Sequence, residues 1–332
     1  MLTRYAFCLA LLICTLSGLA QEPQNNDSLN LVMPEARGRI VVPHDLSESL
    51  QLLAVYDNGH RPVAQFTDKK SGVEISYILF PNFSGKPNGD GCREDVIEPL
   101  LNRFKGSISN VKRSSESSSE NGTVSTASYF IAYMEGAKVD QQSVFGFLGD
   151  AKVCAEAHLS KSGYKPADEV ALQARLSMFQ AELSYTPTLK DYFMLATMLF
   201  KNSPGSAAPY YKSALALLPA GENTLRPRRI LTDQLAMSLG MSGKLPESRA
   251  VLEAAIVSDP NYPLNYYNLA CADAEQGDAA QAKVHLQQAF DRKENVIQGE
   301  SLPDPTKDES LLKLKGNASF WALAKSLSPE SR

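Results

Sequence analysis

Apolar residues in the second half of the chain recur at helical spacing, and the pattern itself repeats. Five positions recur 34 residues later with the same residue type: Leu235, Ala236, Gly243, Leu252 and Ala255 match Leu269, Ala270, Gly277, Leu286 and Ala289. A repeat of this length predicts stacked hairpins of two amphipathic helices. We therefore expect helical repeats over 187–299, with regular units at 229–262 and 263–296 and a degenerate unit at 189–219.

The first half of the chain alternates with a period of two, which is typical of strands. Val73, Ile75, Tyr77 and Leu79 would share one face, and similar runs follow over 123–133 and 151–159. The last run predicts an antiparallel sheet that is wetted on one side. Helical spacing over 96–104 and 166–184 adds helices, and the serine-rich run 114–122 suits a hairpin tip. The predicted fold class is an α+β domain over 31–186, followed by an all-α helical-repeat domain.

Both ends of the chain carry recognisable segments. Arg4 precedes the apolar run 5–16, and small residues reach Ala20, which predicts a signal peptide over 1–20. A retained membrane anchor is the alternative, but the run is shorter than the roughly 20 residues that span a bilayer. Residues 21–30 predict a disordered lead-in, and 300–332 predict a loop and a capping helix. We expect an exported protein, periplasmic or secreted, without a membrane span after the signal is removed.

Three cysteines would remain after export. An oxidising compartment permits a disulfide, and Cys92 and Cys154 lie in the same predicted domain, whereas Cys271 falls inside a repeat helix. A bond between Cys92 and Cys154 is therefore possible, and the sequence leaves it open.

Composition and motifs argue against several functions. The net charge is −4 and no Lys or Arg cluster lies among aromatics, so no nucleic-acid partner is expected. No phosphate loop, Gly-x-Ser-x-Gly elbow or His-Glu-x-x-His pair occurs, and we expect no cofactor and no enzyme activity. Cys154, Glu156 and His158 share a strand face, but same-face neighbours lie about 7 Å apart, too far to share one metal ion. No metal site is expected.

The last regular unit reads Tyr266-Tyr267-Asn268-Leu269-Ala270, then Gly277-Asp278, Ala282 and Ala289, and it resembles a tetratricopeptide repeat. The preceding unit departs from that pattern, with Thr232 where an aromatic residue is common and Ser248 where alanine is usual. In the first half, the order of strands, helix, strands and helix faintly resembles the PsbP/Mog1-like sandwich.

The tetratricopeptide resemblance implies that the first helix of each hairpin lines a concave groove for an extended or helical segment of another protein. The groove would be mainly apolar and adaptable. It lacks the cluster of Lys, Arg and Asn with which some family members hold a terminal carboxylate. The predicted groove residues are Lys190, Phe193, Thr197, Phe200, Ile230, Asp233, Met237, Met241, Leu264, Tyr267 and Cys271.

Two alternatives stay open at this point. The apolar groove could be buried against the α+β domain or the 166–184 helix, because exposed apolar patches are uncommon. The α+β domain could also be the active part, as a small-molecule-binding or catalytic module that the repeats support. Exposure of Phe193, Met237 and Tyr267 would favour a protein-binding scaffold, whereas burial under the α+β domain would favour the second alternative.

Overall fold

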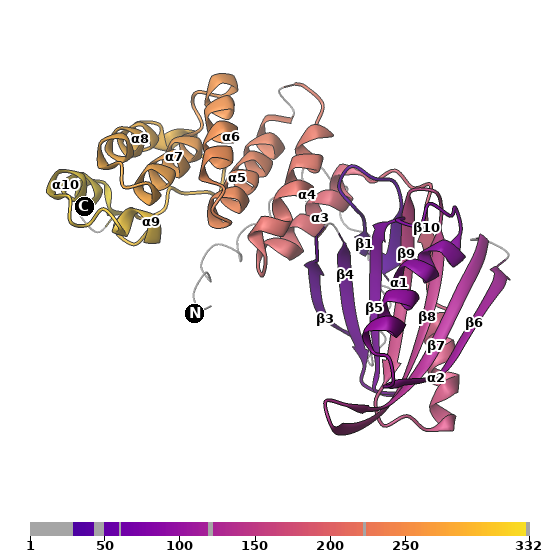
Figure 1. Ribbon diagram of the computed structural model, residues 1–332. Helices are drawn as coiled ribbons and strands as arrows, with labels where there is room; N and C mark the ends of the chain where they lie inside the picture. The colour runs from indigo at the N-terminus through magenta and orange to yellow at the C-terminus, as the bar shows by residue number, and fades with distance from the viewer. Residues whose placement is uncertain (1–28, 43–49, 60, 119–121, 222–223, 330–332) are drawn as a thin grey trace. The chain divides into compact units, whose positions relative to one another are not determined.

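A computed structural model describes residues 29–42, 50–59, 61–118, 122–221 and 224–329 (Figure 1). The predicted signal peptide and most of the predicted lead-in lie outside these residues. Contacts divide the described chain after Ser213 into a sheet unit and an all-helical unit. The predicted fold class, an α+β unit with an antiparallel sheet followed by helices, is confirmed.

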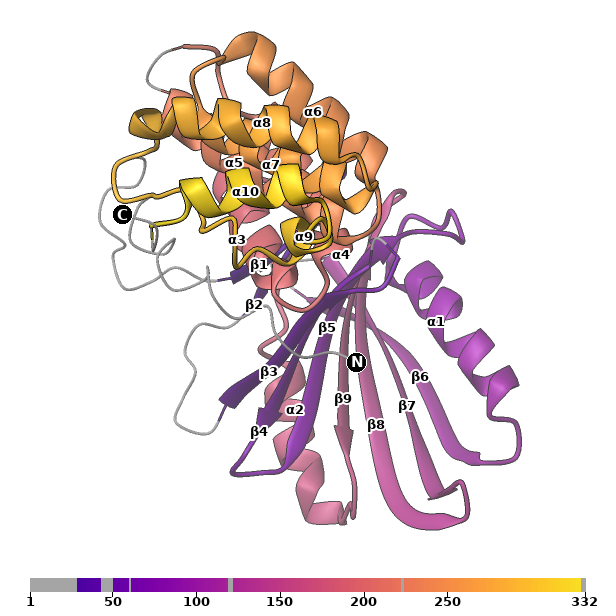
Figure 2. The same cartoon turned by 90° about the vertical axis from the view of Figure 1, so that its left-hand side faces the viewer.

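The sheet unit is built on one antiparallel seven-stranded sheet with the order β3-β4-β5-β9-β8-β7-β6 (Figure 2). Its strands are β3 (Leu50–Asp57), β4 (Pro62–Asp68), β5 (Val73–Pro81), β6 (Ile108–Ser118), β7 (Gly122–Met134), β8 (Ala137–Gly149) and β9 (Val153–Lys161). The alternation predicted in β5 holds, because Val73, Ile75, Tyr77 and Leu79 are all buried. The hairpin tip predicted over 114–122 is too long, since Ser114 to Ser118 lie within β6 and Gly122 begins β7; residues 119–121 lie outside the described residues.

One face of the sheet is covered by α1 (Gly89–Arg103), which begins earlier than its apolar spacing predicted. Asn88 caps it, because the Asn88 side chain accepts a hydrogen bond from the Gly91 amide. Pro99 is accommodated inside the helix. A disulfide joins Cys92 of α1 to Cys154 of β9, and both residues are fully buried.

The other face is covered by α2 (Glu169–Leu176) and a small sheet of β1 (Leu29–Leu31), β2 (Arg39–Val42) and β10 (Ala181–Glu182). The prediction of one helix over 166–184 is wrong at its end: α2 stops at Leu176, and β10 pairs with β2. Arg39 and Glu182 form an ion pair of 2.8 Å beside this pairing. The lead-in prediction is also wrong for residues 29 and 30, which pair with β2.

Helices α3 (Leu189–Phe200) and most of α4 (Pro204–Ala216) belong to the sheet unit, so the division lies later than the boundary at 186/187 that we predicted. The reason is a set of long-range hydrogen bonds. Asn30 of β1 donates to Asp191 of α3 at 2.7 Å, and Tyr210 of α4 donates to Asp57 of β3 at 2.7 Å.

The helical unit contains α5 (Leu225–Met241), α6 (Leu245–Ser258), α7 (Pro263–Glu275), α8 (Ala279–Asp291), α9 (Glu309–Leu312) and α10 (Ala318–Leu327). Gly243 and Gly277 turn the chain between helices at φ of 80° and 77°, a conformation that glycine adopts without a Cβ clash. Within 300–332, where a loop and a capping helix were predicted, the short helix α9 precedes the final helix α10, which begins where the Asn317 side chain accepts a hydrogen bond from the Phe320 amide. No helix within the described ranges is long and apolar enough to cross a membrane.

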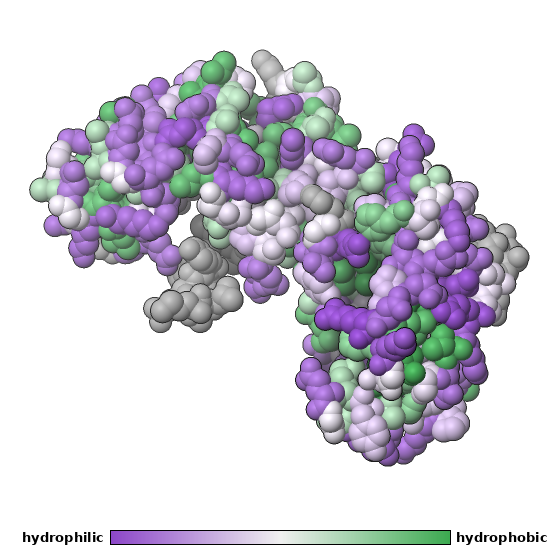
Figure 3. Space-filling view, viewed as in Figure 1, coloured by the Kyte–Doolittle hydropathy of each residue, from purple (hydrophilic) through white to green (hydrophobic). Residues whose placement is uncertain are grey.

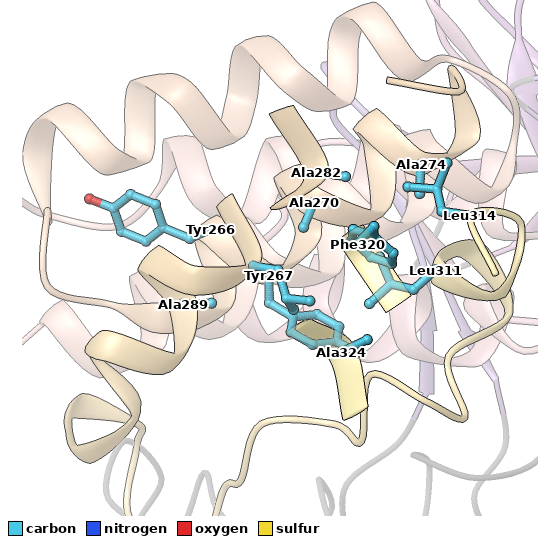
Figure 4. Close-up of a cluster of buried hydrophobic side chains, with 11 residues drawn as sticks. Tyr266, Tyr267, Ala270, Ala274, Ala282, Ala289, Leu311, Leu314, Phe320 and Ala324 are labelled. Atoms are coloured by element: carbon cyan, nitrogen blue, oxygen red, sulfur yellow. The ribbon is translucent and has the colours of Figure 1, made fainter. Parts of the chain in front are cut away.

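Small side chains allow α7 and α8 to pack closely. Ala270, Ala282 and Ala289 have no exposed surface, and they lie in one core with Phe320 of α10 (Figure 4). The predicted final helix therefore caps the end of the array: Phe320 and Ala324 face α8, while Lys325 and Ser326 are exposed.

A larger side chain at Ala282 is expected to destabilise this core. Ala282→Leu adds three carbon atoms where no surface is free, and overpacking of this kind costs about 1–3 kcal/mol. Chemical denaturation of the full chain measures the change in the free energy of unfolding. Ala280→Leu, at an exposed position of the same helix, is the matched control. Equal stability of the two variants would contradict the close packing of α7 and α8.

Candidate functional site

The predicted groove residues of α7 are covered by the chain itself. Tyr267 is 2% exposed, and its hydroxyl donates to the Asp308 carboxylate at 3.3 Å. The Cys271 thiol lies 3.7 Å from the other Asp308 oxygen, and Leu264 is half-buried. We call residues 295–308, which connect α8 to α9, the covering segment. Together with Leu311 of α9 and Phe320 of α10, which share a core with Tyr267, it buries this side chain within the helical unit.

The covering segment also reaches the start of α5 and α7. Tyr262, which precedes α7, donates its hydroxyl to Glu300 at 3.0 Å. Arg229 of α5 donates to the backbone oxygen of Asn295 at 3.2 Å and forms an ion pair with Asp259 at 2.6 Å. The segment is therefore held at both ends by side chains of the repeat helices.

The predicted groove residues of α5 remain partly open. Ile230 is buried, Asp233 and Met237 are half-buried, and Met241 is 40% exposed. We use "inner face" for the side of α5 and α7 that carries these predicted residues. The inner face has a covered part on α7, where Tyr267 is buried, and an open part on α5.

Asp233 is the titratable group at the boundary between the two parts. Burial raises the pKa of the Asp233 carboxyl to about 7, and the negative charge of Glu300 acts in the same direction. A hydrogen bond that the Asn268 carboxamide donates at 2.6 Å opposes this rise. Burial also raises the pKa of Glu300, although Tyr262 donates a hydrogen bond to it. Protonation of Asp233 near neutral pH therefore changes the charge of the inner face.

The four predicted groove residues of α3 lie in the sheet unit and are not part of this inner face. Lys190 is exposed, and Thr197 donates its hydroxyl to the backbone oxygen of Phe193. Phe193 and Phe200 meet the Tyr211 ring of α4 edge-on, with ring centroids 6.3 and 6.2 Å apart. Both phenylalanines thus take part in the packing of their own helix pair.

A buried carboxylate that the sequence analysis missed holds three helices of the helical unit together. Asp273 of α7 is 1% exposed, forms an ion pair with Arg249 of α6 and is hydrogen-bonded to the Nδ1 atom of His285 of α8. The three residues are far apart in sequence and no spacing rule connects them. Their arrangement indicates a structural role, because both partners approach Asp273 from neighbouring helices.

The sheet face of Glu156 and His158 is not wetted, contrary to our prediction. Helix α1 packs on this face, Glu156 is 4% exposed, and the His158 ring stacks on Phe145 at 4.2 Å. Burial raises the pKa of Glu156 to about 8 and lowers the pKa of His158 to about 4. Nowhere in the described part of the chain do three or more His, Cys, Asp or Glu side chains form a group that could hold a metal ion.

The pKa of Glu156 predicts how the stability of the sheet unit depends on pH. The folded state keeps the Glu156 proton up to about pH 8, whereas the unfolded state loses it near 4.5, so stability falls as the pH rises through this window. His158 acts in the opposite direction below its ordinary pKa of 6.5. As the pH rises from 6.5 to 8, the free energy of unfolding of Glu156→Gln should therefore increase by about 1–2 kcal/mol relative to that of the wild type.

Urea denaturation at several pH values measures this difference. Glu74→Gln, which replaces an exposed carboxyl on the neighbouring strand β5, is the control and should follow the wild type. A stability difference between Glu156→Gln and wild type that does not change with pH would show that Glu156 titrates at its ordinary pKa.

Comparison with known proteins adds no assignment. No protein-family model matches the chain, and no curated protein matches it significantly. The likeness to tetratricopeptide repeats therefore stays a hypothesis that rests on the repeated residues.

Proposed function

We propose that this chain is an exported, non-enzymatic scaffold whose helical unit binds a segment of another polypeptide on its inner face. The observation that carries the proposal is the covering segment itself. An irregular polypeptide stretch already lies on α7, held through Glu300 and Asp308 by two tyrosine hydroxyls. A surface that offers hydroxyl donors and apolar contacts to one polypeptide stretch is chemically suited to another.

The open part of the inner face is where a partner would bind. Met237 and Met241 supply adaptable apolar contact area, and Asp233 lies beside them. Apolar side chains remain visible among the polar surface of the helices in Figure 3. A partner with apolar side chains would gain burial there without displacing the covering segment.

Two observations support export. The apolar run 5–16 and the small residues before position 21 have the composition of a signal peptide. The buried disulfide between Cys92 and Cys154 suits an oxidising compartment, because such bonds are rare in the reducing cytosol.

A second candidate function is small-molecule binding by the sheet unit, and Glu156 is the observation that favours it. A buried carboxyl with a strongly raised pKa is typical of functional sites, although structural positions also show such shifts. A cationic ligand that paired with Glu156 would lower its pKa and release a proton on binding.

The scaffold proposal is tested by photo-crosslinking. A photoreactive residue introduced at Gln234, on the same helix as Met237, would capture the partner from an extract of exported proteins. Met237→Glu with Met241→Glu should abolish the captured species, because each substitution places a charge in the apolar contact. Val257→Glu, at an 86% exposed position of α6, is the matched control and should retain them. Identical captured species in all three proteins would contradict binding at the inner face.

A further inference from the structure

The unit at 229–262 lacks a large side chain that the unit at 263–296 has. Tyr266 of α7 is 6% exposed, donates its hydroxyl to the Pro260 backbone oxygen at 2.9 Å, and lies under the Arg292 guanidinium at 4.5 Å. Figure 4 shows its ring pointing away from the Tyr267 and Phe320 side chains. The residue 34 positions earlier, in α5, is Thr232.

A cavity of about 270 Å³ lies beside Thr232, at the place in the 229–262 unit that corresponds to the Tyr266 ring in the 263–296 unit. Ser258 and Ala255 line it, and they precede Arg292 and Ala289 by the same 34 positions. Leu215, Leu235 and Val251 make the wall mainly apolar. All of its lining residues belong to the helical unit. The missing aromatic ring therefore explains why the space is empty of protein atoms.

One polar side chain in this cavity wall lacks a partner. Asn265 of α7 lines the cavity and is 2% exposed, and its Oδ1 atom is buried without a hydrogen bond. A buried polar group left without a partner destabilises the protein, and a ligand that supplies the hydrogen bond removes this cost. Because a carboxamide carries both a donor and an acceptor, the group that complements it in either orientation is another amide.

We propose that this cavity binds an aromatic side chain of a partner polypeptide, with the adjoining peptide group hydrogen-bonded to the Asn265 carboxamide. The aromatic class follows from the repeat itself, which places a tyrosine ring in the corresponding space of the next unit. The peptide group follows from the unpartnered amide at the wall. The source of the ligand rests on the proposed function, whereas the cavity is a separate surface from Met237 and Met241.

Small probes test the cavity directly on the full chain. N-acetylphenylalaninamide supplies a ring with two amide groups, and N-acetylalaninamide supplies the same amides without the ring. In an amide NMR titration, the phenylalanine probe should give saturable shifts at Thr232, Val251 and Asn265. The alanine probe should bind at least tenfold more weakly. Absence of saturable shifts at these residues, or equal affinity for both probes, would overturn the proposal.

Variants locate the binding. Thr232→Tyr restores the ring that the repeat lacks, so it should raise Tm and abolish binding of the phenylalanine probe. Thr232→Val keeps the cavity volume and should bind as wild type does. Asn265→Leu removes the amide while keeping the number and branching of the side-chain heavy atoms, and it should weaken binding several-fold. Undiminished binding by a folded Thr232→Tyr protein would place the probe elsewhere and contradict the proposal. If Thr232→Tyr does not fold, undiminished binding by Asn265→Leu does the same.

The cavity proposal and the scaffold proposal can be contradicted separately. If the chain binds neither probe but still captures a partner at the inner face, only the cavity proposal is contradicted. A chain that binds the phenylalanine probe in the cavity but captures no partner supports the cavity and contradicts the scaffold function.

Discussion

The close approach of α7 and α8 is the constraint on which the helical unit depends. Three alanines without exposed surface, Ala270, Ala282 and Ala289, let the two helices pack, and Gly277 lets the chain turn between them. Because three of these four residues recur 34 positions earlier with the same type, as Ala236, Gly243 and Ala255, α5 and α6 form a similar hairpin. The fixed interval then brings α5 and α7 next to each other, and their shared side becomes the inner face.

Polar interactions decide what this face can do. Glu300 and Asp308 of the covering segment accept hydrogen bonds from Tyr262 and Tyr267, so the segment closes the α7 part of the face. Beside it, Asp233 has a pKa of about 7, because burial and the charge of Glu300 disfavour its ionised form. The open part on α5 thus combines apolar methionines with a carboxyl group whose charge changes near neutral pH. The cavity beside Thr232 is lined by residues other than Asp233, Met237 and Met241, and it results from a local departure from the repeat.

Regular features of the fold could be predicted from the sequence because each has a period. The helix pairs, their glycine turns and the buried face of β5 all follow from spacings of a few residues. The strand β10 could not be predicted, since Ala181 and Glu182 have no pattern of their own and pair with β2 only after the chain has folded. The burial of Glu156 was missed for a related reason. Alternation tells which residues share a face, but not that α1 covers it.

Prediction of the candidate site from the sequence was limited in the same way. The repeat pattern placed Ile230, Met237 and Tyr267 on the first helices correctly, yet it carried no information about residues 295–308, which have no helical or strand period. Whether a groove is open depends on such irregular segments. Likewise, the assignment of α3 to the sheet unit depends on Asn30 and Asp191, which are 161 residues apart. Thr232 is the exception, since the sequence already showed a departure from the repeat at that position.

Specific contacts hold the covering segment on α7, and a double-mutant cycle measures the strength of the contact between Tyr267 and Asp308. Tyr267→Phe removes one hydroxyl, and Asp308→Asn removes the charge while keeping an oxygen for the start of α9. Urea denaturation of the wild type, both single variants and the double variant gives their coupling energy. A coupling of about 0.5–3 kcal/mol is expected, as for residues in direct contact. Additive effects of the two substitutions would show that the Asp308 carboxylate does not hold the segment on Tyr267.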